Sequence, residues 1–504
     1  MGKHVIDEYS SHRDGKIYKD YDCTLNQTNI KNNNNKFYII QLIEKGKEYY
    51  VFIRYGRVGE KGRPSDTKYG SIENAIGYFE KQFKSKTGNV WSTAQSGNFV
   101  SKSGKYWLCE MDYDDVDGID DDDDSNTDGK TDTNDNGKDA SCTLDERVQD
   151  FLSLVSDVKT MKNTMVSLDI DTKKLPLGKL SQKQIDKGYE ILNKIKLALK
   201  QKPQTQAIKD EMSDLSSQYY TVVPYVCGRV APPVIDTDKM IDKYTDTLDE
   251  LSNITVAAKI VKDTNSKKAK TDVHPLDGVY NQLNTTIKPL DKQSDEWNVI
   301  KDYVFNTHAS THSSYTVELM DIFEIQRDGE RALFDKECKS IDNRTLLWHG
   351  TRLTNYCSIL QKGLLLRPDV IPGTYITGKM FGYGIYGANS FSKSFNYCGA
   401  NSRESVACLF LAEFALGKTS NRVQSDYYIT KDKLAQLDCN STWGQGRSTP
   451  SGYSTLSDGV KVPNGKLCTS NVPGGSLLYD EFIVYDQNQI NLRYIVQVKG
   501  KFKY

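Results

Sequence analysis

The sequence lacks any apolar run close to the roughly 18 residues that a membrane-spanning helix needs. Its ten cysteines include no C-x-x-C pair, so we expect reduced thiols inside a cell and no zinc finger or other metal site. Residues Met1–His4 do not have the pattern of a secretory leader. These absences together predict a protein that is neither secreted nor embedded in a membrane.

The net charge of −1 conceals two regions of opposite charge. Residues 112–140 carry thirteen Asp and two Lys, whereas residues 1–110 carry eighteen Lys or Arg and twelve acidic residues. A basic region tied to an acidic tract is compatible with a polyanionic partner such as nucleic acid. Two solvated surfaces without a partner are the alternative.

The acidic segment contains too few apolar residues to form a core, so we expect a disordered linker over residues 112–141. Before the linker, two strands within residues 36–59 joined by a turn at 44–47, a polar inserted loop at 32–35 and a helix capped by Ser71 predict a small α+β domain over 1–111. After it, amphipathic stripes at 147–166, 185–195 and 236–262 predict an all-α bundle over 142–265. Ser181 and Gln184 have the spacing of a capping box.

From about His274 the pattern changes to a helix near 294–305 followed by short aromatic and β-branched strands between glycine loops. This pattern is typical of a mixed, largely antiparallel sheet, here over residues 272–504. The expected fold class is therefore α+β and multidomain.

The stretch "MFGYGIYGANSFSKSFNYC" at 380–398 contains G-x-G-x-x-G at Gly382, Gly384 and Gly387. A dinucleotide-binding Rossmann turn needs a buried strand before the first glycine and a helix at the third. The preceding residues 373–379 are polar and glycine-rich, and a helix is expected only near 390–394. We therefore reject a Rossmann dehydrogenase.

Three features of the last region are unusual for purely structural residues. His349 follows the apolar run 346–348 and precedes Gly350, where the backbone can approach a ligand closely. Asp480 and Glu481 interrupt an apolar strand, and a buried ionised carboxylate is costly unless it is paired or hydrogen-bonded. Aromatic residues crowd 380–398 and suit a flat heteroaromatic ligand. A structural histidine, an edge strand and an aromatic core are the respective alternatives. Together, however, the three match the needs of glycosyl cleavage through an oxocarbenium-like transition state.

Several long motifs resemble the DNA-dependent poly(ADP-ribose) polymerases of the short type that lacks zinc fingers. "YGRVGEKG" at 55–62 and "GKYWLCEMDY" at 104–113 resemble the WGR domain of that family, and residues 161–185 resemble the start of its helical regulatory domain. "NTHASTH" at 306–312, "LLWHGTRLTN" at 346–355, the stretch 380–398 and "SLLYDEFIVYD" at 476–486 resemble its ADP-ribosyltransferase domain. The resemblance covers almost the whole chain.

The resemblance implies an H-Y-E triad of His349, Tyr386 and Glu481, with Lys393 beside the catalytic Glu481. NAD+ is the implied substrate, without a metal, and the implied residues that hold it are His349, Gly350, Thr351, Asn355, Arg367, Tyr386, Ser394 and Tyr397. Met380, Tyr479 and His312 match the positions on the acceptor side that allow polymer elongation, and Tyr55, Gly56 and Arg57 match the DNA-binding and interdomain positions.

The chain departs from the family pattern at a few of these places. Tyr55 replaces the tryptophan that names the WGR domain, and Lys379 and Tyr383 differ from the residues expected near the nicotinamide pocket. Leu365 occupies a position where an arginine often approaches adenosine, which makes Arg367 the candidate replacement.

The resemblance further implies a nuclear enzyme that is activated by DNA strand breaks or their 5′ phosphate. Its implied partners are damaged DNA and acceptor proteins, including itself and chromatin proteins, with no membrane partner. A mono(ADP-ribosyl)transferase and a catalytically silent DNA-binding scaffold are the two rival functions.

Overall fold

The structure is a computed structural model that describes residues 4–109, 141–168, 170, 181–268, 273–366, 380–400, 403–472 and 474–503, without the side chains of 266–268. The chain forms two compact units, one made of Met1–Asn136 and Val158–Lys262 and the other of Gly137–Asp157 and Asp263–Tyr504. The predicted linker lies outside the described residues except for residue 141. The expected α+β multidomain fold is confirmed.

The first unit begins with a five-stranded antiparallel sheet in the order β4-β3-β2-β1-β5. The predicted turn between β2 and β3 is confirmed, since Lys45 pairs with Glu48 and Gly46 adopts the positive φ of 62° that a tight turn requires. The predicted inserted loop is shorter than residues 32–35, because Asn34 and Asn35 already belong to β2. The elements of this part are β1 Lys16–Asn29, β2 Asn34–Lys45, β3 Glu48–Arg57, β4 Arg63–Tyr69, α1 Ile72–Thr87, α2 Trp91–Gln95 and β5 Trp107–Cys109.

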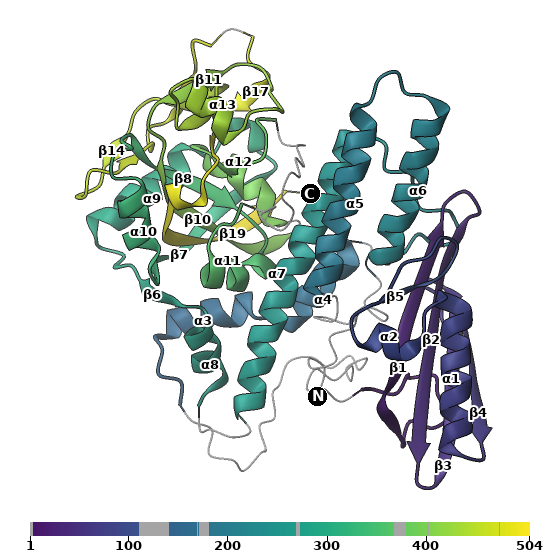
Figure 1. Cartoon of the computed structure of the whole chain (residues 1–504). Helices are drawn as coiled ribbons and strands as arrows, with labels where there is room; N and C mark the ends of the chain where they lie inside the picture. The colour runs from purple at the N-terminus through teal and green to yellow at the C-terminus, as the bar shows by residue number, and fades with distance from the viewer. Residues whose placement is uncertain are drawn as a thin grey trace. The chain divides into compact units, whose positions relative to one another are not determined.

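Both faces of this sheet are covered. Helix α1 lies along one face of the sheet (Figure 1). It packs Ala75, Phe79 and Phe83 against that face, and Ser71 caps its N-terminus by accepting from the backbone N–H of Asn74, as predicted. The opposite face is covered by residues 4–12, which have no regular secondary structure and which place Ile6 and Tyr9 on the apolar cluster around Phe37 and Phe52. We call residues 4–12 the N-terminal brace.

The same unit contains four helices that follow the amphipathic pattern expected from the sequence. Ser181 caps α5 by accepting from the N–H of Gln184. The Ser181 half of the predicted capping box is confirmed and the Gln184 half is wrong. The Gln184 amide donates to the Val222 carbonyl on α6, and its oxygen does not accept from the Ser181 N–H. The helices are α4 Val158–Ser167, α5 Gln182–Lys200, α6 Gln206–Val222 and α7 Asp238–Lys268.

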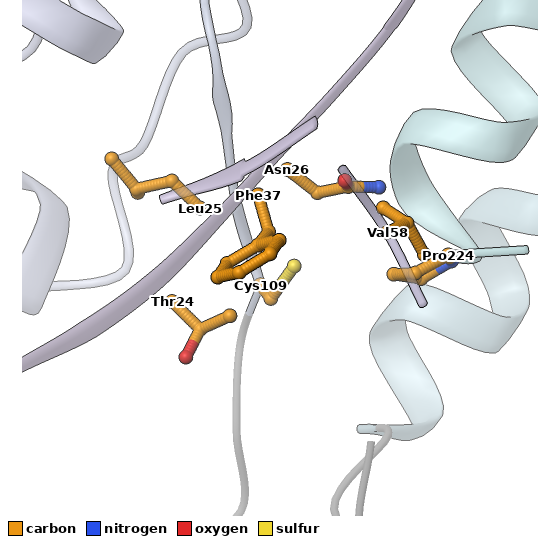
Figure 2. Close-up of a pocket in the computed structure, with 7 residues that line it drawn as sticks. All are labelled: Thr24, Leu25, Asn26, Phe37, Val58, Cys109 and Pro224. Atoms are coloured by element: carbon orange, nitrogen blue, oxygen red, sulfur yellow. The ribbon is translucent and has the colours of Figure 1, made fainter. Parts of the chain in front are cut away.

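The sheet is joined within this unit to the end of α6 and to the segment after it by polar contacts. Asn26 on β1 donates to the carbonyls of Tyr220 and Thr221, and Asn35 on β2 donates to that of Tyr225. Figure 2 shows a small hollow here, whose lining includes Asn26, Phe37 and Pro224. Its volume of about 10 Å³ leaves room for a single water at most. The two parts therefore fit closely, and their backbone groups are satisfied by side-chain amides.

The second unit is built on three sheets. The largest has the order β14-β15-β8-β10-β19-β7-β6, and the smaller two have the orders β11-β12-β18-β9 and β16-β13-β17. Pairing is antiparallel except at β15–β8, β11–β12 and β13–β17, which agrees with the predicted mixed, largely antiparallel core. The strands are β6 Thr285–Pro289, β7 Tyr315–Arg327, β8 Arg344–Gly350, β9 Ile385–Gly387, β10 Glu404–Ala415, β11 Thr419–Arg422, β12 Ser441–Gly444, β13 Gly446–Pro450, β14 Ser454–Thr455, β15 Lys461–Val462, β16 Leu467–Thr469, β17 Leu477–Tyr479, β18 Glu481–Val484 and β19 Ile490–Phe502.

Helices cover the largest sheet and bury a core around Trp348, Ile300 and Tyr303. Helix α3 belongs to this unit: Arg147 pairs with Asp321, and the Phe151 ring lies 5.3 Å from that of Phe323.

In the described part of the chain, we find no helix long and apolar enough to cross a membrane. The remaining helical elements are α3 Glu146–Val155, α8 Pro275–Gln282, α9 Asp295–Asn306, η2 Ser310–His312, α10 Glu330–Glu337, η3 Leu353–Asn355, α11 Tyr356–Lys362, α12 Phe391–Phe395, η4 Asn396–Cys398, α13 Lys431–Gln436 and η5 Gln487–Gln489.

The N-terminal brace gives the first unit a pH-dependent stability. Burial alone lowers the pKa of His4, but Asp22, 3.2 Å from its Nδ1, and Asp20 outweigh that effect and raise the pKa above 6.5. The stabilising contribution is therefore complete below pH 6.5 and is lost as the pH rises through the raised pKa. We expect the difference in melting temperature between the wild type and His4→Gln to shrink on going from pH 6 to pH 9, as measured by thermal unfolding. A difference that is independent of pH contradicts this prediction.

Candidate active site

The two neighbouring carboxylates predicted on one strand lie where the chain leaves one sheet and enters another. β17 ends at Tyr479, β18 begins at Glu481, and Asp480 connects them. The expectation of one continuous strand is therefore wrong. Asp480 is only 1% exposed, and its carboxylate accepts from Asn389, Thr449 and the backbone N–H of Gly446 at 2.7–2.8 Å. These three bonds satisfy the buried charge and hold the junction in place.

Glu481 is partly exposed and pairs with a cation, whereas Asp480 is buried and satisfied by neutral donors. The Glu481 side chain is 13% exposed, and its Oε1 lies 2.8 Å from the Nζ of Lys393 on α12. The same ammonium group donates to the carbonyls of Tyr479 and Asp480, so α12 is tied to the junction directly before Glu481 as well as to Glu481 itself. Burial lowers the pKa of Lys393, and the Glu481 carboxylate offsets part of this effect. Glu481 is thus a fixed carboxylate at the edge of the protein interior.

His349 and Tyr386 lie on strands of two different sheets, and backbone contacts join those strands. Trp348 exchanges two backbone hydrogen bonds with Ala388, and the Nδ1 of His349 lies 3.0 Å from the carbonyl oxygen of Tyr386. Because a carbonyl only accepts, Nδ1 carries a proton and Nε2 of the neutral ring is an acceptor. Tyr386 pairs with Ile483 on β18, and residues two apart share a face, so Tyr386 and Glu481 lie on the same face of that sheet.

Gly350 ends β8 beside α12. A Cβ atom at this position would lie 1.8 Å from the backbone oxygen of Ser394, so the site has no room for a side chain there. The hydroxyl of Ser394 donates to the Trp348 carbonyl, which places it next to the backbone of Gly350. Tyr397, one turn further on, is 63% exposed. The bare backbone of Gly350 and the Ser394 hydroxyl therefore lie close together in space, and the exposed Tyr397 ring follows Ser394 by three residues.

The glycines of the G-x-G-x-x-G pattern serve packing. A Cβ at Gly382 would lie 2.3 Å from the Ile429 carbonyl oxygen, and Gly382 has a φ of 70°. A Cβ at Gly384 would meet Ile483 on β18, and one at Gly387 would meet Phe414 and Leu347. The helix expected near 390–394 is confirmed as α12, and residues 385–387 form the short strand β9. The three glycines thus allow close packing of neighbouring backbone and side chains. This role is consistent with the rejection of a Rossmann turn.

Of the residues predicted on the acceptor side, the structure brings His312 and Tyr479 together at the end of β17. The rings of His312 and Tyr479 are 5.5 Å apart, and the Tyr479 hydroxyl bonds to Thr311. His312 also contacts the Ser392 hydroxyl through Nδ1 at 2.8 Å, and burial lowers its pKa. Met380 packs on the apolar cluster that includes Phe381 and Tyr386. Sequence reasoning missed Thr311, Ser392 and Asn389, which carry no signal of their own because they act through contacts with distant residues.

The other predicted residues of this unit are less well defined. Asn355 is buried and donates to the Thr351 hydroxyl, so these two residues support the turn after β8. Arg367 and Lys379 lie outside the described residues.

In the first unit, Tyr55, Gly56 and Arg57 form the end of β3. Tyr55 is 44% exposed and stacks on Tyr38 at 5.7 Å, with the Nζ of Lys86 4.5 Å from the centre of the Tyr38 ring. Gly56 is packed so tightly that a Cβ would lie 2.7 Å from the Cα of Gly62. This end of the strand presents an aromatic face next to positive charge.

Arg57 is bound by the segment between α6 and α7. Its guanidinium donates to the carbonyls of Gly228 and Val230 and to Asn33. The Arg57 side chain therefore connects the sheet to the helical part of the same unit.

One cluster of potential metal ligands occurs among the described residues, namely Cys142, His274 and Asp277. The Nδ1 of His274 accepts from the N–H of Leu276, which caps α8 and leaves the proton of the neutral ring on Nε2. Asp277 already accepts from the backbone and hydroxyl of Thr143. A capped helix accounts for all three residues, and the tautomer of His274 does not favour a metal ligand.

The arrangement suits chemistry at a sugar. A fixed carboxylate, a histidine with an acceptor nitrogen and a tyrosine lie on adjoining strands, beside a backbone edge without a side chain and an exposed aromatic ring. Preorganised charge of this kind stabilises positive charge that develops in a transition state. A carboxylate stabilises a transition state only if its position is fixed. Here the backbone contacts between strands fix the position of Glu481.

Sequence patterns of three families match the chain. The poly(ADP-ribose) polymerase catalytic domain matches residues 294–500, the poly(ADP-ribose) polymerase regulatory domain matches 142–280, and the WGR domain matches 21–98.

Curated relatives cover nearly the whole chain. It is 38% identical to poly [ADP-ribose] polymerase 2 of Arabidopsis thaliana over 491 residues, which is 96% of this chain and 74% of the relative. It is 36% identical to poly [ADP-ribose] polymerase 2 of Homo sapiens over 498 residues, covering 96% of this chain and 80% of the relative. With poly [ADP-ribose] polymerase 1 of Xenopus laevis the identity is also 36%, but the match covers 46% of that relative.

The absence of a side chain at position 350 is open to a direct test. We expect Gly350→Ala to lower the free energy of unfolding by about 3 kcal/mol, because an overpacked site must move backbone atoms. The melting temperature of this unit should fall by roughly 5–10 °C. Gly452→Ala is the matched control, since a Cβ there meets nothing within 4 Å. Equal melting temperatures for the two variants would show that β8 and α12 are not in the contact described.

Proposed function

Because this chain belongs to the poly(ADP-ribose) polymerase family and is an NAD+-consuming ADP-ribosyltransferase, we propose that Glu481, His349 and Tyr386 carry its reaction and that DNA breaks activate it. The observation that supports this most strongly is the Glu481 carboxylate, held by Lys393 at 2.8 Å next to the acceptor-side residue Tyr479.

The reaction breaks the bond between C1 of the nicotinamide ribose and the ring nitrogen of nicotinamide. The bonding electron pair leaves with nicotinamide, and positive charge develops on the sugar. Glu481 stabilises that charge through the ribose hydroxyls and accepts a hydrogen bond from the incoming acceptor. The acceptor atom then forms the new bond to C1 and passes its proton to the Glu481 carboxylate, which releases it to solvent. Removing one such electrostatic contribution commonly costs about 10² to 10³-fold in rate.

The two ends of NAD+ use different residues. Nε2 of His349 accepts from a hydroxyl of the adenosine ribose, in accordance with its tautomer. The backbone of Gly350 and the hydroxyl of Ser394 hold the carboxamide, and Tyr397 stacks on the nicotinamide ring with Tyr386 on the other side. The absence of a Cβ at Gly350 and the exposure of Tyr397 both support this assignment. Thr351, Asn355 and Arg367 complete the proposed binding set.

Met380, Tyr479 and His312 hold the growing ADP-ribose chain. The apolar packing of Met380 beside Tyr386 and the ring contact between His312 and Tyr479 support a second sugar–nucleotide surface next to Glu481. The product is therefore a polymer. The acceptors are proteins, among them this chain and chromatin proteins, and the enzyme acts in the nucleus in DNA repair.

The basic first domain binds the DNA break. The exposed face of Tyr55 replaces the tryptophan of the family pattern and stacks at the broken end, while nearby cations such as Lys86 neutralise phosphates, including the 5′ phosphate. Aromatic stacking tolerates any base, so DNA structure and not sequence is read.

Arg57 links this surface to the helical regulatory part. It donates to carbonyls at 228 and 230, so a rearrangement at the end of β3 reaches the segment between α6 and α7 directly. DNA must bind the active state more tightly than the inactive one, because equal affinity for both states shifts no equilibrium. In the active state the helical domain no longer restricts access of NAD+ to the site.

Incubation of the full chain with labelled NAD+, with and without a nicked duplex, tests the proposal as a whole. We expect long polymer with the nicked duplex and little product without it. Single ADP-ribose adducts alone would refute elongation, and equal rates with and without DNA would refute the regulation.

The role of Glu481 is tested by Glu481→Gln. We expect the rate of ADP-ribose transfer to fall by at least about 10²-fold, because the amide cannot stabilise a sugar cation as a carboxylate does. The affinity for NAD+, measured by calorimetry, should change by only a fewfold. Glu404→Gln removes a surface carboxylate that pairs with Lys499 and should leave the rate unchanged. A rate for Glu481→Gln equal to that of the active control would remove Glu481 from the proposed reaction, whereas the absence of transfer in all variants, the wild type included, would favour a binding scaffold.

The role of Arg57 is tested by Arg57→Ala. Loss of its contacts to the segment at 228–230 should reduce the stimulation of NAD+ turnover by nicked DNA at least tenfold while leaving the DNA-independent rate unchanged. Arg13→Ala is the matched control, since its neighbour His12 stacks on Tyr50 at the opposite end of β3. Undiminished stimulation in Arg57→Ala would remove this residue from the proposed route.

A further inference from the structure

The N-terminal brace, residues 4–12, precedes the part of the chain that matches the WGR pattern, which begins at residue 21. It is nevertheless built into the same sheet. The amide of Gln41 on β2 donates to the Val5 carbonyl and accepts from the N–H of Asp7, so one buried side chain binds the brace backbone on both sides of Ile6.

Asp7 makes the strongest contact between the brace and β3. Its carboxylate binds the guanidinium of Arg54 through three hydrogen bonds of 2.7–3.0 Å. Both side chains are almost fully buried, with exposures of 6% and 7%. A bidentate pair of this kind fixes the orientation of the arginine plane as well as its position.

Arg54 passes this orientation on to the turn between β3 and β4. Its third nitrogen, Nη1, donates to the Lys61 carbonyl at 2.8 Å. Tyr9 of the brace lies between the two residues, with the Arg54 guanidinium and the Lys61 ammonium each 4.8 Å from the centre of its ring. The brace therefore holds both the backbone and the side chain of Lys61.

The turn between β3 and β4, which contains Lys61 and Gly62, packs against the end of β3 that carries Tyr55. A Cβ at Gly62 would lie 2.6 Å from the Tyr55 carbonyl oxygen, and one at Gly56 would lie 2.7 Å from the Cα of Gly62. The Gly62 backbone thus has no freedom to move without displacing Tyr55 and Gly56. A continuous chain of contacts runs from Asp7 through Arg54 and Lys61 to the backbone of Tyr55, the residue whose ring is exposed.

We propose that Asp7, acting through Arg54, is a positioning residue for the binding of broken DNA, and that the N-terminal brace is a functional part of the DNA-binding module. This inference rests on the proposed function of Tyr55–Arg57. Asp7 itself does not touch the DNA, since an anion there would repel phosphate. It sets the position of Lys61, Tyr55 and the turn, which do.

The opposing explanation is that the brace only covers the apolar face of the sheet. The chain offers a matched control, because Asp66 on β4 also holds the brace, accepting from the Ser10 hydroxyl and the Ser11 N–H. Within the described part of the chain, Asp66 makes no hydrogen bond or ion pair with Arg54 or Lys61, so its loss loosens the brace without releasing the turn. Asp7→Asn and Asp66→Asn therefore separate positioning from covering.

The experiment measures the affinity of full-length variants for a fluorescent nicked duplex, together with NAD+ turnover as a function of DNA concentration. We expect Asp7→Asn to weaken DNA affinity about tenfold and to raise the DNA concentration for half-maximal turnover by the same factor. The maximal rate and the DNA-independent rate should be unchanged. Asp66→Asn should bind DNA within twofold of the wild type.

Arg54→Gln should weaken DNA binding as Asp7→Asn does, and the double variant should lose no more than either single variant, because both changes break one chain of contacts. Tyr9→Leu keeps the apolar cover without leaving a buried charge unpaired, and we expect a loss of about threefold. It serves as the test if Asp7→Asn unfolds at the assay temperature.

Wild-type affinity in both Asp7→Asn and Tyr9→Leu overturns the proposal. Equal losses in Asp7→Asn and Asp66→Asn, with equal falls in melting temperature, also overturn it in favour of simple covering. A wild-type chain that does not bind the nicked duplex overturns the proposed DNA-binding function instead, so the two failures are distinguishable.

Discussion

The geometry of the catalytic unit depends on one buried carboxylate that takes no part in the chemistry. Asp480 accepts three hydrogen bonds from groups on β13 and on the loop after β9, at the point where the chain passes from one sheet to the next. A buried ion costs several kcal/mol unless its oxygens are satisfied, so this junction has one favourable arrangement. Glu481, as the next residue, inherits its position from that arrangement.

The site is otherwise held by main-chain contacts. The bridge between Trp348 and Ala388 joins two sheets, and the contact of His349 with the Tyr386 carbonyl depends on that bridge. Glycines at 350, 382, 384 and 387 allow strands and helix to approach to distances that any side chain would prevent. Electrostatic stabilisation requires groups that do not reorganise during the reaction, and backbone hydrogen bonds between packed strands meet that requirement.

The first unit uses a different kind of contact. Asn26, Asn35 and Arg57 bind carbonyl groups in and after α6, and these bonds are polar and in part exposed. A guanidinium binds phosphate oxygens as well as it binds carbonyls, so such contacts can be exchanged when a polyanion arrives. In contrast, the Asp7–Arg54 pair is buried and joined by three hydrogen bonds. The sheet therefore combines a fixed support on one face with an exchangeable contact at its end.

The sequence by itself determined the kind of each domain, the pairing of β2 with β3 and the cap at Ser71, because these follow from local patterns of apolar residues and turns. The roles of His349, Tyr386 and Glu481 follow from motifs that resemble a family, and they stay predictions. The sequence also indicated that one acid of the pair at 480–481 must be satisfied in the interior. Only the tertiary structure decided which acid that is, that the strand around them is two strands, and that Gln184 binds α6 and not its own cap. The brace and its pair with Arg54 were likewise invisible, since 47 residues separate Asp7 from its partner. Contacts between residues that far apart depend on how the sheets pack, and no local periodicity encodes them.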